Sequence, residues 1–249
     1  GVIGVNGMGK STLLKIVAGI EESDAGTISM GNQVKICYLP QMPVFEAGTT
    51  ILRAATEGNY DELNRWTIEA EAKSMLNQLG FTDYDEKIEH MSGGQKKRVA
   101  LVRALLTPAD ILVLDEPTNH LDNEMSEWLE EYLIQFRGAI LMVTHDRYFL
   151  DRVVNRIVEV DHGKLYNYPG NYSEFVRLKA ERQNMELATE RKRKSLLRTE
   201  LEWLHRGARA RSTKQKAHID RIHAMQEMKD IQEEKRVMLD SVASRMGNK

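Results

Sequence analysis

Hydrophobic and polar positions change their spacing repeatedly along the first 170 residues. Short, uninterrupted apolar runs are typical of strands that are buried on both faces of a parallel sheet, whereas apolar residues three or four apart favour helices. The predicted strands are Val2–Val5, Thr27–Met30, Val34–Leu39, Ile111–Leu114 and Ile140–Val143, with a closing hairpin of Ile157–Val160 and Leu165–Tyr168. The predicted helices are Lys10–Ala18, Asp61–Leu79 and Gln95–Leu106. This alternation predicts an α/β fold.

The pattern changes after residue 171. From Tyr172 to about His205 the sequence contains neither glycine nor proline, which favours one helix about 50 Å long at 1.5 Å per residue. Gly207 interrupts this pattern, and a return helix is predicted from about Thr213. Its predicted apolar face consists of Ile219, Ile222 and Met225. The second region is therefore predicted to be an antiparallel helical hairpin.

Composition excludes several classes of protein. The 249 residues include 35 Lys and Arg, 37 Asp and Glu, and one cysteine. That residue, Cys37, rules out a disulfide scaffold or a cysteine-rich zinc module, and its apolar neighbours predict a buried thiol. No run of 18 apolar residues is present, so we expect a cytoplasmic protein without a membrane partner. The sequence begins at the edge of a motif and without Met, which indicates a fragment.

Charge is distributed unevenly. Residues 1–177 carry 17 basic and 26 acidic side chains, whereas residues 178–249 carry 18 and 11. The predicted tip of the hairpin, residues 206–216, holds five basic residues among eleven and no aromatic residue. A basic tip favours contact with a nucleic-acid backbone rather than base stacking, although a solvated helix face is the alternative. The candidate contacts are Arg206, Arg209, Arg211, Lys214 and Lys216.

Residues 4–12 read GVNGMGKST and match the P-loop pattern, with a predicted strand before them and a predicted helix after them. Glycines allow consecutive backbone N–H groups to point at phosphate oxygens, and the start of the helix adds a positive end. Lys10 is expected to reach the β- and γ-phosphates, and the Ser11 hydroxyl to bind Mg²⁺. The predicted nucleotide-binding residues here are Asn6, Gly7, Gly9, Lys10, Ser11 and Thr12.

Acidic and polar side chains follow three other predicted strands. Asp115 and Glu116 end an apolar run at the sheet edge where ligands bind in α/β folds, so Asp115 fits a Mg²⁺ ligand and Glu116 a catalytic base. An acidic strand end that caps the next helix is the alternative. Gln41 is a candidate for Mg²⁺ or its water, and His145 for catalysis. Taken alone, these two are more simply a loop residue and a structural histidine.

A Ser-Gly-Gly run opens the helix that precedes Asp115, and it forms a second anion site by the same physics as the P-loop. Here the sequence resembles the ATP-binding cassette family, whose signature reads LSGGQ, with Met91 in place of Leu. The P-loop, Gln41, the signature, Asp115-Glu116, a D-loop ending at Asp122, and His145 follow in the family's order. The resemblance adds Ser92, Gly93, Gly94, Gln95 and Asp122 to the nucleotide-binding residues.

The resemblance implies ATP and Mg²⁺ as cofactors, bound between two cassettes, with the P-loop of one facing the signature of the other. It implies a first cassette over residues 1–170, with a helical subdomain at about 49–106 that includes Trp66 in its packing, and a charged helical linker over 171–249. A chain with one cassette is then expected to hydrolyse ATP weakly or not at all.

Residues 118–122 (TNHLD) and 144–151 (THDRYFLD) resemble the ABC-F branch, and the tip most resembles its Uup-type members. That branch implies two cassettes on one chain, joined by a charged hairpin, and action on the ribosome and tRNA during translation. Two alternatives stay open: a DNA-structure-associated ABC ATPase, and the motor subunit of an ABC transporter. Lys96, Lys97 and Arg98 are either a solvated helix face or an RNA contact.

Overall fold

The computed structural model describes residues 1–59, 65–205 and 219–223. The chain divides into two compact regions, residues 1–177 and 178–249, and each is described by itself. Within these described ranges, no helix is both long and apolar enough to cross a membrane.

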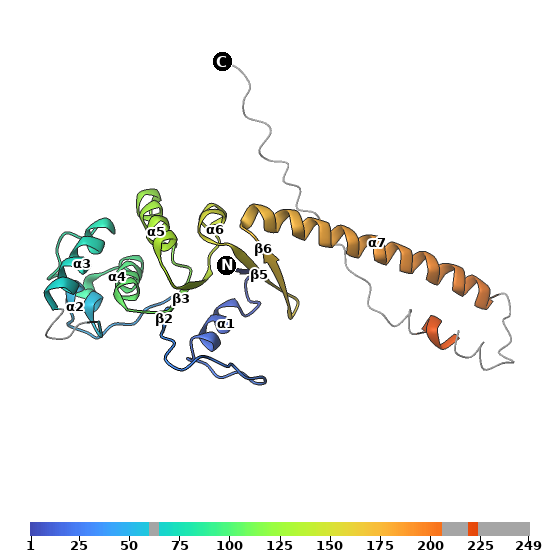
Figure 1. The fold of residues 1–249 in the computed structure, drawn as a ribbon, viewed down its shortest axis with the longest axis horizontal. Coiled ribbons are helices and arrows are strands. Elements are labelled where there is room, and N and C mark those ends of the chain that lie inside the picture. Colours follow the sequence, from blue (N-terminus) through green and yellow to red (C-terminus); the bar gives the residue numbers. More distant parts are fainter. Residues whose placement is uncertain (60–64, 206–218, 224–249) are drawn as a thin grey trace, which may run out of the picture. The chain divides into compact units, whose positions relative to one another are not determined.

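A six-stranded sheet in the order β2-β3-β4-β1-β5-β6 forms the centre of the first region (Figure 1). All neighbouring strands are parallel except the closing β5–β6 hairpin. The strands are β1 (Val2–Gly4), β2 (Ile36–Leu39), β3 (Ile111–Asp115), β4 (Ala139–Val143), β5 (Arg156–Asp161) and β6 (Lys164–Pro169). Because β1 to β4 run in the same direction, the loops that follow them meet at one edge of the sheet.

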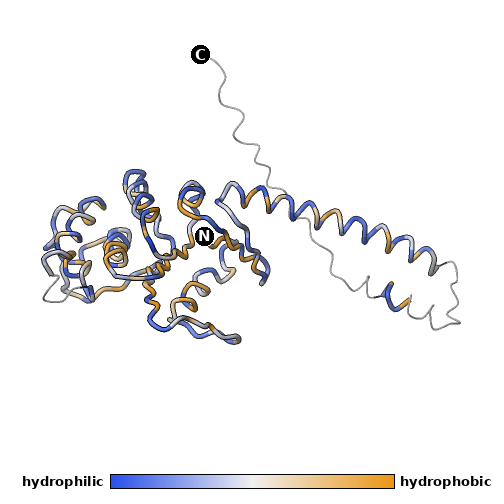
Figure 2. The backbone as a smooth tube through the Cα atoms, viewed as in Figure 1, coloured by the Kyte–Doolittle hydropathy of each residue, from blue (hydrophilic) through white to orange (hydrophobic). Residues whose placement is uncertain are grey.

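Alternate residues of the strands enter two hydrophobic cores. On one face, Val113 packs with Leu14 of α1 (Lys10–Val17). On the other, Leu112 and Leu114 belong to a larger core with Leu129 of α5 (Asn123–Gln135). Figure 1 shows α1 on one side of the sheet, with α5 and α6 (Arg147–Val153) on the other. Figure 2 shows apolar residues concentrated along the central strands.

A group of helices lies beyond β2, and the larger core continues into it. The group consists of α2 (Ile51–Thr56), α3 (Arg65–Gln78), the 3₁₀ turn Ile88–His90 and α4 (Gly93–Leu106). Ile51, Leu76 and Leu101 are almost fully buried between these helices. Since α4 also contacts β2, the group is anchored to the outer strand of the sheet.

Most predicted strands and helices are confirmed within one or two residues, but Thr27–Met30 is not a strand. Ile28 and Met30 are each about half exposed, and no described strand pairs with this segment. An isolated strand leaves its backbone groups unpaired, so alternation alone does not stabilise it. The packing role predicted for Trp66 is also wrong, because 82% of this residue is exposed. Cys37 is only partly buried.

Helix α7 (Tyr172–His205) has the predicted bounds. Its first turn lies in the first region, where Asn171 Oδ1 accepts a hydrogen bond from the Glu174 amide at 3.2 Å and Phe175 packs edge-on against Tyr168. In the second region, residues 219–223 are helical and Ile222 is buried. The rest of the predicted return helix, with Met225, and the basic tip Arg206–Lys216 lie outside the described residues.

Candidate nucleotide-binding site

The P-loop connects β1 to α1 and leaves open space above its backbone. Gly7 and Gly9 have φ angles of +83° and +82°, which residues other than glycine rarely adopt. A Cβ added at either position would meet no described atom within 4 Å. Gly9 is the N-cap of α1 and, because it has no side chain, it cannot accept a hydrogen bond from the first amides of the helix. Among the described residues, no cap side chain occupies the first amides of α1, which leaves them available to an anion.

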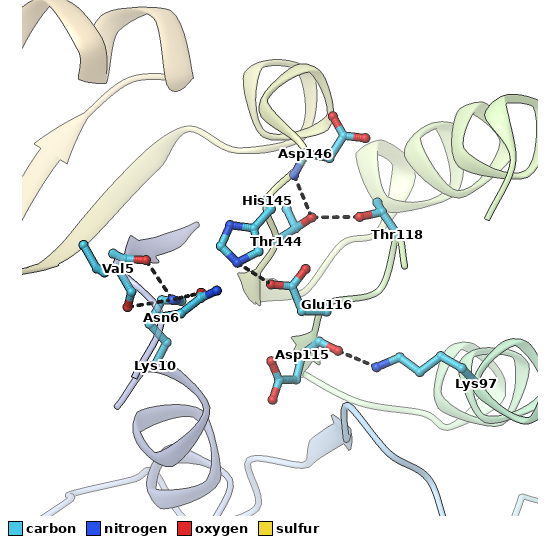
Figure 3. Close-up of polar contacts among 11 residues, drawn as sticks. Val5, Asn6, Lys10, Lys97, Asp115, Glu116, Thr118, Thr144, His145 and Asp146 are labelled. Carbon is cyan, nitrogen blue, oxygen red and sulfur yellow. Dashed lines mark hydrogen bonds and ion pairs between the residues drawn. The ribbon is translucent and has the colours of Figure 1, made fainter. Parts of the chain in front are cut away.

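Lys10 is folded back on the loop that precedes it. Its Nζ donates hydrogen bonds to the carbonyl oxygens of Gly4 at 2.7 Å and Val5 at 3.1 Å, and to Asn6 Oδ1 at 3.4 Å (Figure 3). The residue is buried, so these partners keep its ammonium solvated by the protein itself. The positive charge is thus fixed beside the free amides of α1.

Two buried carboxylates end β3. Asp115 is 1% exposed and Glu116 is 5% exposed, and neither Asp115 Oδ1 nor Glu116 Oε2 has a hydrogen-bond partner among the described residues. Burial raises the pKa of the Glu116 carboxyl above its ordinary value of 4.5. Buried carboxylate oxygens without partners are uncommon, and they are suited to bind a cation, a water or a proton donor. The alternative interpretation of this pair as a helix cap does not hold, because Asp122 caps α5.

A left-handed turn fixes the direction of Glu116. Its φ is +54°, and its amide donates to the Val143 carbonyl of β4 at 2.8 Å. Beside it, His145 Nε2 lies 3.4 Å from Glu116 Oε1, with 62% of the histidine side chain exposed. Thr144 Oγ1 is hydrogen-bonded to Thr118 Oγ1 at 2.8 Å and accepts from the Asp146 amide at 3.1 Å (Figure 3). The turns after β3 and β4 are therefore tied together, with Glu116 and His145 facing each other.

A cavity of about 480 Å³ collects the predicted residues that follow β1, β2, β3 and β4. Asn119, which sequence reasoning did not place in the site, also lines it; its position within the D-loop was the available signal. The lining is formed by Asn6, Gly7, Gly9, Lys10, Ser11, Thr12, Gln41, Asp115, Glu116, Asn119, Val143 and His145. The cavity has a positive charge at Lys10 and backbone amides at its wall, so it fits the phosphates of a nucleotide better than an apolar ligand.

The signature residues lie outside this cavity. Ser92 is the N-cap of α4 and forms a capping box with Gln95: Ser92 Oγ accepts from the Gln95 amide at 3.3 Å, and Gln95 Oε1 accepts from the Ser92 amide at 2.9 Å. Gly93 and Gly94 begin the helix between them. Asp122, also outside the cavity, accepts from the Met125 amide at 2.9 Å. The chain thus does not bring its own signature to its own P-loop.

Oxygen donors around the cavity fit Mg²⁺ in the company of phosphates. No group of three His, Cys, Asp or Glu side chains suited to a metal occurs in the part of the chain that the structure describes. Mg²⁺ commonly uses one or two protein oxygens and completes its shell with phosphate and water. Ser11, Gln41 and the unpaired Asp115 Oδ1 are the donors that would serve here.

Both alternatives for the basic run after the signature are wrong for Lys97, whereas Arg98 is partly buried. Lys97 is 3% exposed, and Arg98 Nη1 donates to the Leu79 carbonyl at 2.7 Å while its guanidinium lies over the Phe81 ring. Burial lowers the pKa of Lys97 to about 8. Tyr38, on β2, has a buried hydroxyl without a hydrogen-bond partner in the part of the chain that the structure describes. Burial and then the Asp115 charge raise the pKa of this hydroxyl to about 12.

The fold and the cavity are those of a P-loop ATPase domain. A protein-family profile described as "ABC transporter" matches residues 1–119, and a second profile with the same description matches residues 158–240. The chain is 45% identical to the uncharacterized ABC transporter ATP-binding protein YfmR of Bacillus subtilis and 38% identical to the energy-dependent translational throttle protein EttA of Haemophilus influenzae. These alignments cover 91% and 89% of the chain.

The chain belongs to the ATP-binding cassette family, as the order of its motifs predicts. It spans 42% of YfmR and 47% of EttA, less than half of the length of these relatives. A crystal structure of archaeal ribosome recycling factor aABCE1 with ribosomal stalk protein aP1 is 30% identical to it, with a TM-score of 0.57 over 72% of this chain and 36% of that one. The mixed α/β cassette fold with its helical region is therefore confirmed.

Replacing Glu116 by Gln is expected to stabilise the fold at neutral pH. The folded-state pKa of Glu116 is raised, so as pH rises past 4.5 the unfolded chain loses this proton first and the native state loses stability. Gln carries no proton to lose, and the exposed His145 contact contributes little. Urea unfolding between pH 4 and 8 should show a stability difference that favours the variant and grows with pH. A wild type more stable than the variant at pH 7 contradicts this account.

Proposed function

We propose that this chain is part of an ABC-F ATPase that binds and hydrolyses ATP at sites shared by two cassettes and acts on the ribosome and tRNA during translation. In this proposal Lys10 and the P-loop amides bind the phosphates. Ser11, Gln41 and Asp115 bind Mg²⁺ or its water, and Glu116 with His145 directs the attacking water. The signature residues Ser92–Gln95, together with Asp122, serve the nucleotide of the companion cassette.

The separation of signature and P-loop is the observation that supports a shared site. Ser92 begins α4 with its amides and hydroxyl at the protein surface, whereas the cavity is lined by residues from four other turns. A second cassette has to supply the missing Ser-Gly-Gly helix start. The chain alone is therefore expected to hydrolyse ATP weakly.

The translational role rests on the long helix and on the relatives. Helix α7 is 34 residues long, and the basic residues that follow it in the sequence are suited to a phosphate backbone. EttA is named a translational throttle protein, and aABCE1 is a ribosome recycling factor crystallised with a ribosomal protein. YfmR, which shares more residues with this chain, is not assigned a role by its name.

Cosedimentation tests this proposal. Glu116→Gln, combined with the matching change in the companion cassette of the natural full-length protein, is expected to pellet with ribosomes in MgATP and to remain in the supernatant in MgADP. The logarithm of the affinity should fall linearly with the logarithm of the salt concentration, and each phosphate contacted should add about 0.7 to 0.9 to the slope. Changing Arg206, Arg209 and Arg211 to Gln should reduce this slope.

Competition separates the translational role from its alternative. Ribosomal RNA, tRNA and branched DNA are added at matched salt to the hydrolysis-blocked protein. Displacement by rRNA and tRNA fits the proposal, whereas preferential displacement by branched DNA favours a DNA-structure ATPase. Absence of ATP-dependent pelleting contradicts ribosome action altogether.

A further inference from the structure

Lys97 has an unusual place for a lysine next to a helix start. It is the fifth residue of α4, the helix that opens with Gly93, and it is 3% exposed. Its neighbour Lys96 is only partly buried, because successive helical residues point about 100° apart. Burying an ammonium group costs free energy unless it is fully hydrogen-bonded, so its partners show what the burial achieves.

Both hydrogen-bond partners of Lys97 are backbone carbonyl groups in turns that carry residues of the cavity. Lys97 Nζ donates to the Asp115 carbonyl at 2.5 Å and to the Pro40 carbonyl at 2.8 Å (Figure 3 shows the first). Each carbonyl shares a planar peptide group with the amide of the next residue, which is Glu116 in one case and Gln41 in the other. Fixing these two oxygens therefore fixes the orientation of the peptides that lead into Glu116 and Gln41.

A second contact joins the same helix start to the turn after β3. The ring of His120 lies against Gly94, where an added Cβ would be 3.0 Å from His120 Cβ and Cγ. His120 has a left-handed φ of +69°, so this turn is held in a conformation that β-carbon-bearing residues seldom adopt. The first two turns of α4 thus contact the loops after β2 and β3, although the signature itself lies outside the cavity.

We propose that Lys97 is a positioning residue that couples the signature end of α4 to the Gln41 and Asp115–Glu116 turns. It acts on the reaction through those backbone turns and touches no nucleotide. The inference rests on the proposed ATP site and deepens it. Binding of Mg²⁺ with ATP in this cassette's cavity is transmitted to the helix start at Ser92, which serves the nucleotide of the companion cassette. Lys10 and the P-loop amides are outside this connection.

The test separates metal-dependent from metal-independent nucleotide binding. Equilibrium affinities for ATP are measured with Mg²⁺ and with EDTA in the natural full-length protein. The variants are Lys97→Met, an unbranched apolar side chain one atom shorter that removes the donors, Lys97→Gln, a side chain of the same number of atoms in line as Met that keeps two N–H donors, and the control Lys96→Met. Amide hydrogen exchange of residues 41–42 and 115–116, which all carry a backbone N–H, is followed without nucleotide.

Lys97→Met is expected to weaken MgATP binding about tenfold, since turns that are no longer held must be ordered when the metal binds, and ordering the backbone of one residue has a cost of that size. Metal-free ATP binding should stay within about twofold, because the P-loop is unchanged. Lys97→Gln should give an intermediate loss of about threefold. Exchange in both turns should accelerate in Lys97→Met and remain unchanged in Lys96→Met.

Equal loss of MgATP and metal-free ATP binding in the folded variants would overturn the inference, because a purely structural lysine acts on both alike. A folded Lys97→Met variant that binds MgATP with wild-type affinity would also overturn the inference. If Lys97→Met does not fold, Lys97→Gln decides: a folded variant with wild-type MgATP affinity overturns the inference. A wild type that binds no MgATP refutes the proposed ATP site instead, so the two failures are distinguishable.

Discussion

Replacing Lys10 by Ala is expected to weaken MgATP binding about a hundredfold. In the structure Lys10 Nζ is within 3.4 Å of three oxygens of its own loop, beside the free amides of α1 and inside the cavity. Phosphate oxygens that enter the cavity replace some of these partners, and a hydrogen bond between two charged groups contributes about 1.5–3 kcal/mol. Loss of the ammonium removes that contribution and the Coulombic attraction together. Calorimetric titration of the natural full-length protein with MgATP measures the change.

Lys15→Ala is the matched control for that experiment. Lys15 lies on the same helix, and its exposed ion pair with Glu21 at 2.7 Å lies outside the cavity lining. Nucleotide affinity should be unchanged by this variant. If Lys15→Ala and Lys10→Ala weaken binding equally, α1 contributes through its general charge, and the specific role of Lys10 is wrong.

Replacing Glu116 by Gln is expected to lower the turnover of ATP by about 10² to 10⁴, the range typical of a lost general base. Glu116 is the group with a raised pKa at the edge of the cavity, 3.4 Å from His145, and Gln preserves its shape without its basicity. Binding of MgATP should stay within about threefold, because Lys10 and the P-loop amides are unaltered. Single-turnover hydrolysis and equilibrium titration separate the two quantities.

An exposed carboxylate provides the comparison for Glu116. Glu124 lies in the first turn of α5, on the surface and outside the cavity lining, so Glu124→Gln should turn over ATP at the wild-type rate. Turnover in Glu116→Gln within tenfold of wild type would show that another group activates the water. Loss of binding and turnover in the same proportion would show that Glu116 acts in binding rather than in catalysis.

Sequence predicted the parts of the site that are encoded locally. The glycine turn, the strand that ends at Asp115 and the helix that opens with the Ser-Gly-Gly run each depend on a few consecutive residues, and their physics is visible in the sequence. The meeting of these turns followed from one further rule, that loops after parallel strands share a sheet edge. The positions of Gln41 and His145 in the cavity agree with that rule.

Features that depend on distant contacts were not predictable. The burial of Lys97 follows from two carbonyls, Pro40 at 57 and Asp115 at 18 residues' separation, which no local pattern reveals. Trp66 is exposed although its size and apolarity favour burial, because α3 packs through residues such as Ala72 and Leu76. The helices α5 and α6 were missed even though Asp122 and Asp146 cap them, since each cap residue was interpreted through its motif.

An experimental structure of the hydrolysis-blocked, natural full-length protein with MgATP tests the account most directly. We expect the β- and γ-phosphates to lie against Lys10 Nζ and the first amides of α1, and the helix start at Ser92 to contact a nucleotide bound by the other cassette. A nucleotide that contacts Lys10 and Ser92 of the same cassette, or one bound away from Lys10, would contradict it.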